Sequence, residues 1–290
     1  MSLFTIPCPL CNAVSFRHLF DKLSQRNENY TVVECRNCKL VMVNPQPDES
    51  TLRPYYEESY FDKRTDRGYD NYFSDALKKQ INSIYLKNLY DLNFMMFERT
   101  ILSGPVPRCL DIGCAAGYFV ELMKQRGWNA EGIEISKKAA SFGIDQLNLK
   151  IHNSDFLETD LTGEYDLITL WASIEHLRQP FDVMSKASSK LRRGGRMILT
   201  TCRYGILAKM RGTSWRYMNV PEHLFYFSIN NMKQIAEKTG FGVIKIISYG
   251  SGFTAKRDSS LSYKIIKKIA DPMVKTLNIG DMMAVHLEKL

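Results

Sequence analysis

The sequence predicts an α/β protein whose main domain is a doubly wound, mostly parallel sheet, preceded by a small metal-binding module. Three observations support this prediction. From about residue 105 onward, short apolar segments alternate with amphipathic ones, which is typical of βαβ units with helices on both faces of a sheet. A glycine-rich turn, from Asp111 to Gly117, follows the first apolar segment. Near the N-terminus, four cysteines form two C-x-x-C pairs.

The elements of the main domain follow from apolar periodicity and from helix start and stop signals. Ser136 is a candidate N-cap, and glycines close several of the predicted helices. The expected strands are 108–111, 130–135, 149–152, 165–171, 196–201, 241–248 and 282–287, and the expected helices are 118–126, a helix opening at Ser136, 181–191 and 229–239.

Composition limits the class of protein. The chain has 290 residues, of which 44% are hydrophobic and 24% charged, as in ordinary globular proteins. No apolar run approaches the roughly 18 residues of a membrane span. The first residues also lack a basic region followed by an apolar stretch and a cleavage site, so we expect no signal peptide and a cytoplasmic protein.

The glycine-rich turn predicts a nucleotide-like ligand, because Gly113 and Gly117 would let that ligand approach the backbone closely. Glu134 ends the second strand about 20 residues further on, where a carboxylate accepts hydrogen bonds from ribose hydroxyls. Asp111 at the mouth of the turn would repel a pyrophosphate and attract the ammonium and sulfonium groups of S-adenosylmethionine. At the end of the third strand, Asp155 and Phe156 suit the amino group and the ring of an adenine.

These motifs, together with Glu175 to Pro180 and Leu191 to Gly195, resemble the ordered motifs of class I S-adenosylmethionine-dependent methyltransferases. The resemblance covers roughly residues 105–250 and implies a Rossmann-like sheet whose last strand is antiparallel. One departure is alanine at positions 115 and 116, which predicts a small local adjustment of the turn. The expected cofactor-binding residues are Asp111, Gly113, Ala115, Gly117, Glu134, Ile135, Asp155, Phe156 and Trp171.

The four N-terminal cysteines, Cys8, Cys11, Cys35 and Cys38, have the spacing of a zinc ribbon. Four thiolates close a tetrahedron around Zn²⁺ and leave no position for water, so we expect a structural role. The alternative is four free or redox-active thiols. A Cys-Pro-x-Cys pair followed by Cys-x-x-Cys and Asn-Pro-x-Pro is similar to a group of bacterial methyltransferases that act on sugars and other small molecules.

Methyl transfer needs an aligned acceptor and a base for its proton. Two Glu-His pairs follow predicted strands: Glu175-His176 after the fourth, and Glu222-His223 after the fifth. The second pair resembles the Pro-Glu-His-Leu segment of the sugar methyltransferase group. We therefore expect His223 to be the general base, oriented by Glu222, with His176 as the competing choice.

The formal net charge is +8, and residues 186–216 carry nine cations and no acid. This run indicates either a solvated surface or a small anionic acceptor, such as a nucleotide-linked sugar or an envelope glycan precursor. The alternative acceptor is RNA, bound by the zinc module and the basic surface. A basic amphipathic helix is expected over residues 259–275, where it either covers the sheet, the preferred interpretation, or touches a membrane surface.

The expected domains are a zinc-ribbon module (1–45), a helical tyrosine-rich linker or lid (46–104), and a Rossmann-like domain (105–290) with a helical insertion near 255–276. In the linker, Tyr55, Tyr56 and Tyr60 either form part of a lid over the cofactor or pack a linker helix.

Overall fold

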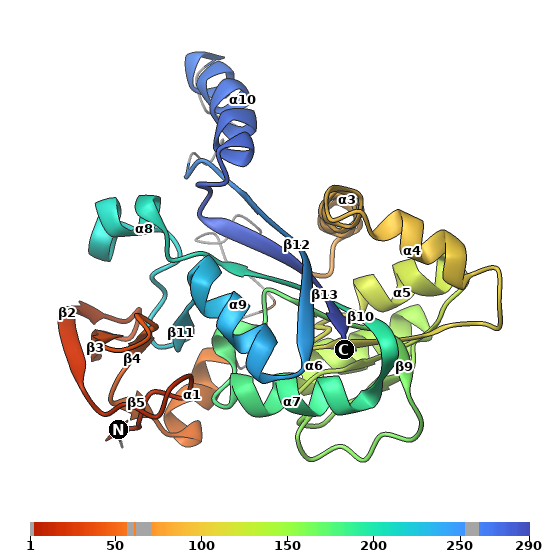
Figure 1. Cartoon of the computed structure of the whole chain (residues 1–290), viewed down its shortest axis with the longest axis horizontal. Helices are drawn as coiled ribbons and strands as arrows, with labels where there is room; N and C mark the ends of the chain where they lie inside the picture. The colour runs from red at the N-terminus through yellow and green to blue at the C-terminus, as the bar shows by residue number, and fades with distance from the viewer. Residues whose placement is uncertain (1–2, 57–60, 62–70, 253–260) are drawn as a thin grey trace.

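The computed structural model describes residues 3–56, 61, 71–252 and 261–290. Its centre is a seven-stranded sheet in the order β12-β13-β10-β9-β6-β7-β8 (Figure 1). The strands are β6 (Arg108–Ile112), β7 (Asn129–Ile133), β8 (Ile151–His152), β9 (Tyr165–Trp171), β10 (Leu191–Cys202), β12 (Phe241–Tyr249) and β13 (Met282–Lys289). β13 pairs antiparallel with both β10 and β12, while the pairs from β10 to β8 are parallel. The predicted Rossmann-like sheet, with its last strand antiparallel, is confirmed.

Helices cover both faces of this sheet. One face packs against α7 (Pro180–Lys190) and α9 (Ile229–Lys238), and the other against α5 (Tyr118–Gln125) and α6 (Lys137–Leu147). Neighbouring residues of one strand serve opposite faces, since Leu167 belongs to the second core and Ile168 to the first, as the two-residue period of a strand requires. The central strands β6 and β9 are therefore buried along most of their length, whereas Val243 and Ile244 on the edge strand β12 are 40% and 41% exposed.

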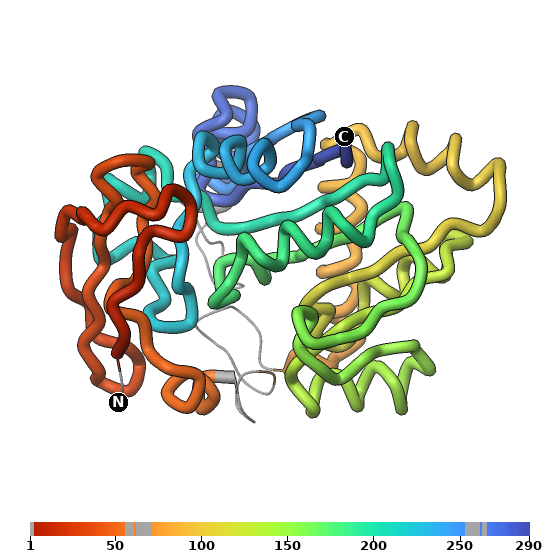
Figure 2. Tube along the Cα trace, turned by 60° about the horizontal axis from the view of Figure 1, so that its bottom comes forward, coloured from red at the N-terminus to blue at the C-terminus, as the bar shows by residue number. Residues whose placement is uncertain are grey.

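The N-terminal module is a small antiparallel sheet that the main domain completes. Its strands β2 (Phe16–Leu23), β3 (Asn29–Cys35) and β4 (Val41–Val43) are joined by β11 (Phe225–Tyr226) in the order β11-β4-β3-β2. Phe225 pairs with Met42 and Tyr226 with Val41. Figures 1 and 2 both show the module beside the segment that carries β11. A second, two-stranded sheet pairs β1 (Leu3–Phe4) with β5 (Gln46–Pro47).

The described residues between the module and the first strand of the central sheet include three helices with defined bounds. They are α1 (Glu49–Tyr56), α3 (Asp75–Asp91) and α4 (Phe94–Ile101). Leu89, Leu92 and Phe94 belong to the same core as α5, so α3 and α4 extend the helical layer on that face. The proposed division at residues 45 and 104 stays a prediction, and both boundaries are crossed by side-chain packing or strand pairing.

After β10 the chain forms α8 (Ile206–Arg211), and between β12 and β13 it forms α10 (Leu261–Thr276). The preferred prediction, that a helix here covers the sheet, is wrong for the described part, because α10 projects away from the body of the protein (Figure 1). Residues 253–260, where the predicted helix and insertion begin, lie outside the described residues. Every helix in the described ranges is too short or too polar to cross a lipid bilayer.

Candidate active site

The turn between β6 and α5 is built on two glycines that no other residue can replace without strain. Gly113 and Gly117 have φ angles of +70° and +77°, in the left-handed region that favours glycine. A Cβ at Gly113 would lie 2.9 Å from Cβ of Ser173, and one at Gly117 would lie 2.6 Å from Cδ1 of Leu149. The turn is thus held tightly between the loops that follow β9 and precede β8.

Ala115 occupies the same turn with a φ of +50°, which costs a non-glycine residue roughly 1–2 kcal/mol. The predicted local adjustment takes this form. The strained conformation directs the amide N–H of Ala115 to Oε2 of Glu134, 2.8 Å away. The hydrogen bond joins the turn to the end of β7. Ala115, where the sequence departs from the family pattern, therefore contacts Glu134, the residue expected to bind ribose.

Two buried carboxylates lie at this edge of the sheet. Asp111 is 2% exposed and accepts a hydrogen bond of 2.6 Å from the Thr169 hydroxyl on β9. Burial raises the pKa of Asp111 to about 8, the hydroxyl bond opposes this rise, and the charge of Glu134 adds to it. Burial also raises the pKa of Glu134, although the backbone amides of Ser136 and Ala115 lower it. Such a pair provides a strong attraction for a cation that displaces the protons.

The predicted adenine contacts differ in accessibility. Ile135 is 65% exposed, and the exposed Asp155 accepts a 2.6 Å hydrogen bond from the amide of Leu157. Phe156 is only 4% exposed and packs in the core, with Nζ of Lys186 5.1 Å from its ring centroid. Trp171 packs against two other aromatic rings. The roles assigned to these four residues stay predictions, but Ile135 and Asp155 present the accessible surfaces.

Tyr85 on α3 was missed by the sequence analysis. Its ring lies 4.7 Å from that of Trp171, and the charge of Asp111 adds to the effect of burial in raising its pKa. It therefore lies close to the carboxylate of Asp111. No local motif marks it, because it reaches the site only through the packing of α3 on α5. The predicted lid residue Tyr55 instead hydrogen bonds to Ser24 and Glu28 in the module, while Tyr60 and the side chain of Tyr56 lie outside the described residues.

Both candidate histidines and a glutamate converge at the end of β9. Side-chain atoms of Glu175, His176 and His223 all lie within 4.8 Å of one another. The two imidazole rings are 4.6 Å apart at an angle of 87°. The backbone also links the two segments, since the amide of Leu224 donates to the carbonyl of Glu175 at 2.8 Å. The two Glu-His pairs, which are 47 residues apart in the sequence, thus form one cluster.

The surroundings of His176 determine which of its ring nitrogens carries the hydrogen. Its Nδ1 lies 2.8 Å from the carbonyl oxygen of Glu222, and a carbonyl only accepts hydrogen bonds, so Nδ1 must carry the hydrogen. In neutral His176 the lone pair is therefore on Nε2. His223 is 3% exposed, and its Nδ1 is 3.7 Å from Sγ of Cys202. Burial raises the pKa of that thiol, which keeps it neutral.

The role predicted for the Glu222 carboxylate, to orient His223, stays a prediction. The carboxylate that clusters with both histidines belongs to Glu175, which is 2% exposed. Glu222 contributes its backbone carbonyl to His176. Its residue also lines a cavity of about 180 Å³ between the module and the loop before β11, with Lys22, Gln25 and Asn219 among the other lining residues.

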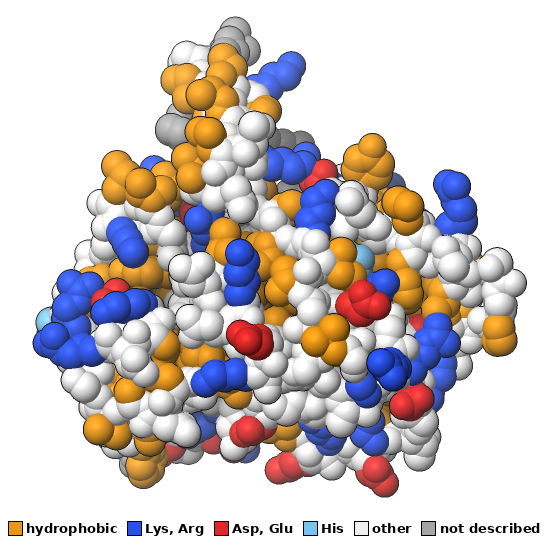
Figure 3. Space-filling view, in the orientation of Figure 1, with side chains coloured by type: hydrophobic (Ala, Val, Ile, Leu, Met, Phe, Trp, Pro, Cys, Tyr) orange, Lys and Arg blue, Asp and Glu red, His pale blue; other side chains and the backbone are white. Residues whose placement is uncertain are grey.

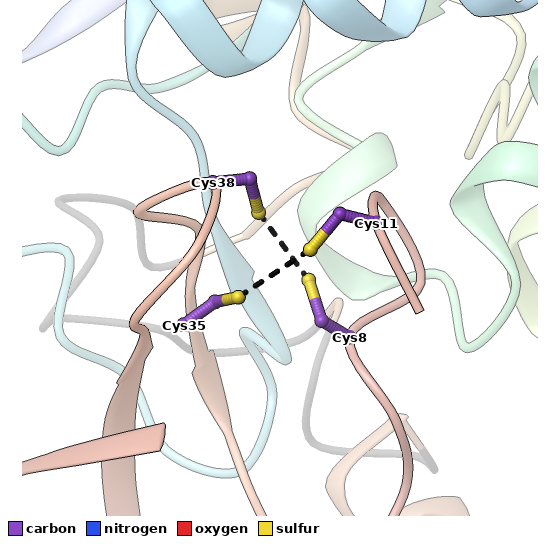
Figure 4. Close-up of side chains that lie close together, drawn as sticks. All are labelled: Cys8, Cys11, Cys35 and Cys38. Carbon is purple, nitrogen blue, oxygen red and sulfur yellow. Dashed lines mark hydrogen bonds between the residues drawn. The ribbon is translucent and has the colours of Figure 1, made fainter. Parts of the chain in front are cut away.

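The four cysteines of the module are brought together as predicted. They come from two turns that face each other (Figure 4). Sγ of Cys8 lies 3.4 Å from Sγ of Cys38, and Sγ of Cys11 lies 3.5 Å from Sγ of Cys35. All four sulfurs lie within 4.8 Å of one another. A tetrahedral zinc site with Zn–S bonds of about 2.3 Å requires sulfur atoms about 3.8 Å apart, so the donor set and its size fit Zn²⁺.

Most cations of the basic run, residues 186–216, form contacts with other groups of the protein. Lys186 and Lys190 donate to backbone carbonyls, and Arg192 and Arg196 form ion pairs with Asp166 and Glu288. Arg203 is half-buried and donates to Ser248. The prediction of an anionic acceptor rested on this run, and the structure assigns these five cations to internal contacts. That basis for the prediction is therefore much weaker.

The comparisons with known proteins identify the family of this chain. Residues 69–246 match a family described as a methyltransferase domain, and the chain belongs to this family. A ubiquinone biosynthesis O-methyltransferase of Dechloromonas aromatica (strain RCB) is 30% identical over 127 residues, which cover 40% of this chain and 53% of that protein. The mitochondrial enzyme of the same name in Schizosaccharomyces pombe is 29% identical over 138 residues, 44% and 50% of the two chains.

The comparison with solved structures indicates the same class of protein fold. Magnesium protoporphyrin IX methyltransferase from Synechocystis PCC 6803, solved with bound SAH, superposes with a TM-score of 0.56 at 14% identity over 84% of this chain and 100% of its own. The predicted class I methyltransferase fold is thereby confirmed. The chain spans about half the length of the curated relatives it matches, and those matches leave the acceptor undetermined.

Proposed function

We propose that this protein transfers a methyl group from S-adenosylmethionine to a hydroxyl oxygen of a small polar acceptor. The observation that carries the proposal is the cluster of Glu175, His176 and His223 at the end of β9. The same strand supplies Thr169, which binds Asp111 of the cofactor site. A single rigid element therefore connects the acidic cofactor pocket to a group able to remove a proton.

In this proposal the glycine-rich turn, Asp111 and Glu134 hold S-adenosylmethionine, with Ile135 and Asp155 at its adenine. When bound, the cofactor supplies a methyl group already activated by a sulfonium. Asp111 and Glu134 attract the positive charge, and their raised pKa values mean that binding favours their ionised forms. The protein then needs only to align the acceptor and accept its proton.

The proton acceptor is proposed to be Nε2 of His176, because the carbonyl of Glu222 fixes the hydrogen on Nδ1. His223 was the predicted base, by resemblance to the sugar methyltransferase group. Its burial and its neighbour Cys202 favour a supporting role, in which it packs against His176. Glu175 would stabilise the positive charge that develops on the histidine pair.

The acceptor is proposed to be rich in hydroxyl groups, such as a sugar. This choice is supported by the cavity between the module and the loop before β11, whose mixed lining combines Lys22, Gln25, Asn219 and Glu222 with Leu23, Met218 and Val220. The similarity to ubiquinone biosynthesis O-methyltransferases favours a second candidate, O-methylation of a phenolic ring. RNA is a poorer choice, because five cations of the basic run are engaged internally.

We also propose that the four cysteines bind a structural Zn²⁺, which stabilises the module as one wall of the acceptor site. The fit of the sulfur positions supports this assignment. The module and the catalytic loop share a sheet through β4 and β11, so order in one is transmitted to the other. In this arrangement the metal positions the acceptor and takes no part in the chemistry.

A test uses methyl-labelled S-adenosylmethionine with three acceptor classes: nucleotide-linked sugars, dihydroxybenzoates and total RNA. We expect turnover with a sugar, and turnover only with the phenols or only with RNA would replace that choice. His176→Ala should lower kcat at least ~100-fold, within the range for loss of a general base, and His223→Ala less. His18→Ala, an exposed histidine of the module, is the matched control. Full activity of His176→Ala would remove the proposed base.

A further inference from the structure

Helix α10 is attached to the protein by its polar side. Nζ of Lys267 lies 2.7 Å from Oδ2 of Asp271, whose Oδ1 accepts a 3.2 Å hydrogen bond from the amide of Ser251. One turn further on, Nζ of Lys275 forms a 2.6 Å ion pair with Asp91 at the end of α3. The charged stripe of the helix therefore faces the body of the protein.

The opposite stripe of α10 is apolar and faces outward. Ile266, Ile269, Met273 and Leu277 are 50%, 59%, 58% and 62% exposed. Their spacing of three, four and four residues places them in one row on the helix. An ordinary surface helix buries such a row and exposes its charges, so α10 has the reverse orientation. Figure 3 shows apolar side chains along the projecting helix.

A second exposed apolar pair lies on α8. Ile206 and Met210 are 54% and 78% exposed and are one helical turn apart. The guanidinium of Arg211, at the end of α8, is 3.5 Å from the position that a Cβ on Gly252 would occupy. Gly252 is the last described residue before the segment that leads to α10. Ser251, next to Gly252, donates its amide to Asp271 on α10, so the end of α8 and the base of α10 lie near each other.

Charge indicates what covers this surface. Lys209, Arg211 and Lys268 are exposed on the two helices. The acids that contact α10, Asp271 and Asp91, are each paired with a lysine. The chain as a whole carries +8. The charge of Arg211 also acts on the carboxylate of Asp281. Exposed apolar side chains near exposed cations suit the boundary between anionic headgroups and acyl chains.

A second copy of the chain is a weaker fit, because it would bring the exposed Lys209, Arg211 and Lys268 of both copies close together. We propose that the outer faces of α10 and α8 dock the protein on an anionic lipid surface. This inference does not depend on the proposed methyl transfer.

The test is co-sedimentation of the full chain with vesicles of phosphatidylcholine, with and without phosphatidylglycerol. Wild-type protein should bind the anionic vesicles and be released by salt. The double variant Ile269→Asp, Met273→Asp should bind at least ~10-fold more weakly, since two charges would enter the apolar layer. Met96→Asp, at a side chain that is 77% exposed on α4, is the matched control and should bind normally. Circular dichroism and S-adenosylmethionine binding verify that each variant folds.

Three results would overturn the proposal. In the first, the wild-type protein binds neither kind of vesicle, and in the second, the double variant binds as well as the wild type. The third result is a wild-type dimer in light scattering that becomes a monomer in the double variant. Met273→Trp provides an independent measurement on an uncharged variant. Its emission should shift to the blue with anionic vesicles, after subtraction of the wild-type spectrum, and an unchanged spectrum would also contradict docking through α10.

Discussion

The proposed cofactor half and the proposed acceptor half of the active region are built from very different arrangements of chain. The proposed cofactor half is one run of sequence, from Asp111 to Trp171, in which each loop follows its own strand. The acceptor half joins the module, with Lys22 and Gln25, to the loop that contains Glu222 about 200 residues later. Local motifs therefore determine the first half, while the second depends on long-range pairing such as that of β4 with β11. A change in one half should therefore leave the other half intact, and the following variants test this expectation.

Loss of the metal should have the largest effect, and it should disturb the module while cofactor binding is retained. Cys35→Ser removes one of four thiolates, and structural zinc sites contribute roughly 10–16 kcal/mol of binding energy at neutral pH. We expect the variant to lose its zinc, about one ion per chain, and to become sensitive to proteolysis within residues 8–47. Its affinity for S-adenosylmethionine should stay within ~3-fold of wild type. Metal analysis and calorimetry measure both quantities, and Cys109→Ser is the control outside the cluster. A metal-free protein with an intact module would contradict the assignment.

Asp111→Asn should affect only the cofactor half. The amide keeps the shape of the side chain and its contact with Thr169 but removes the charge that attracts the cofactor. We expect affinity for S-adenosylmethionine to fall about 100-fold, equivalent to about 2.7 kcal/mol, with the zinc content unchanged. Calorimetry is the measurement, with Asp145→Asn on α6 as the control. Unchanged affinity would show that this carboxylate does not contact the cofactor.

The pH dependence of cofactor binding should reveal the same carboxylate. Because burial raises the pKa of Asp111 to about 8, the free protein holds a proton there at neutral pH, and cofactor binding must displace it. Affinity should therefore rise roughly tenfold from pH 6 to pH 7 and level off above pH 8. The sign for folding is opposite: the cofactor-free protein should lose stability as pH rises through this range. Asp111→Asn should remove both trends, and a flat profile in the wild type would contradict the raised pKa.

The smallest expected effect is at Ala115. Glycine relieves the strain of a φ near +50° but costs backbone entropy on folding, so Ala115→Gly should raise the stability by only about 0.5 kcal/mol. Thermal unfolding measures this change, with Ala116→Gly as the control at a buried neighbour. A loss of stability at position 115 would show that the methyl group makes a contact more valuable than the strain it brings.

Sequence patterns predicted the central sheet well, because its strands and helices are marked by local periodicity. The four cysteines were also recognisable, since each C-x-x-C pair forms within one turn. The role predicted for Glu222 stays a prediction, and the sequence did not single out Glu175 as the carboxylate that lies with both histidines. Tyr85 and the reversed orientation of α10 were also missed. Both depend on contacts with distant elements, which periodicity within one segment does not record.

The pairing of β11 with β4 has a consequence for synthesis of the protein on the ribosome. The module has all its cysteines by residue 38 and its third strand by residue 43, yet the strand that covers its edge is residues 225 and 226. While roughly 180 further residues are made, β4 has an unpaired edge, and such edges promote association with other chains. The module must therefore stay partly unpaired during synthesis, and a bound metal would hold its shape until β11, which follows His223, is made and pairs with β4.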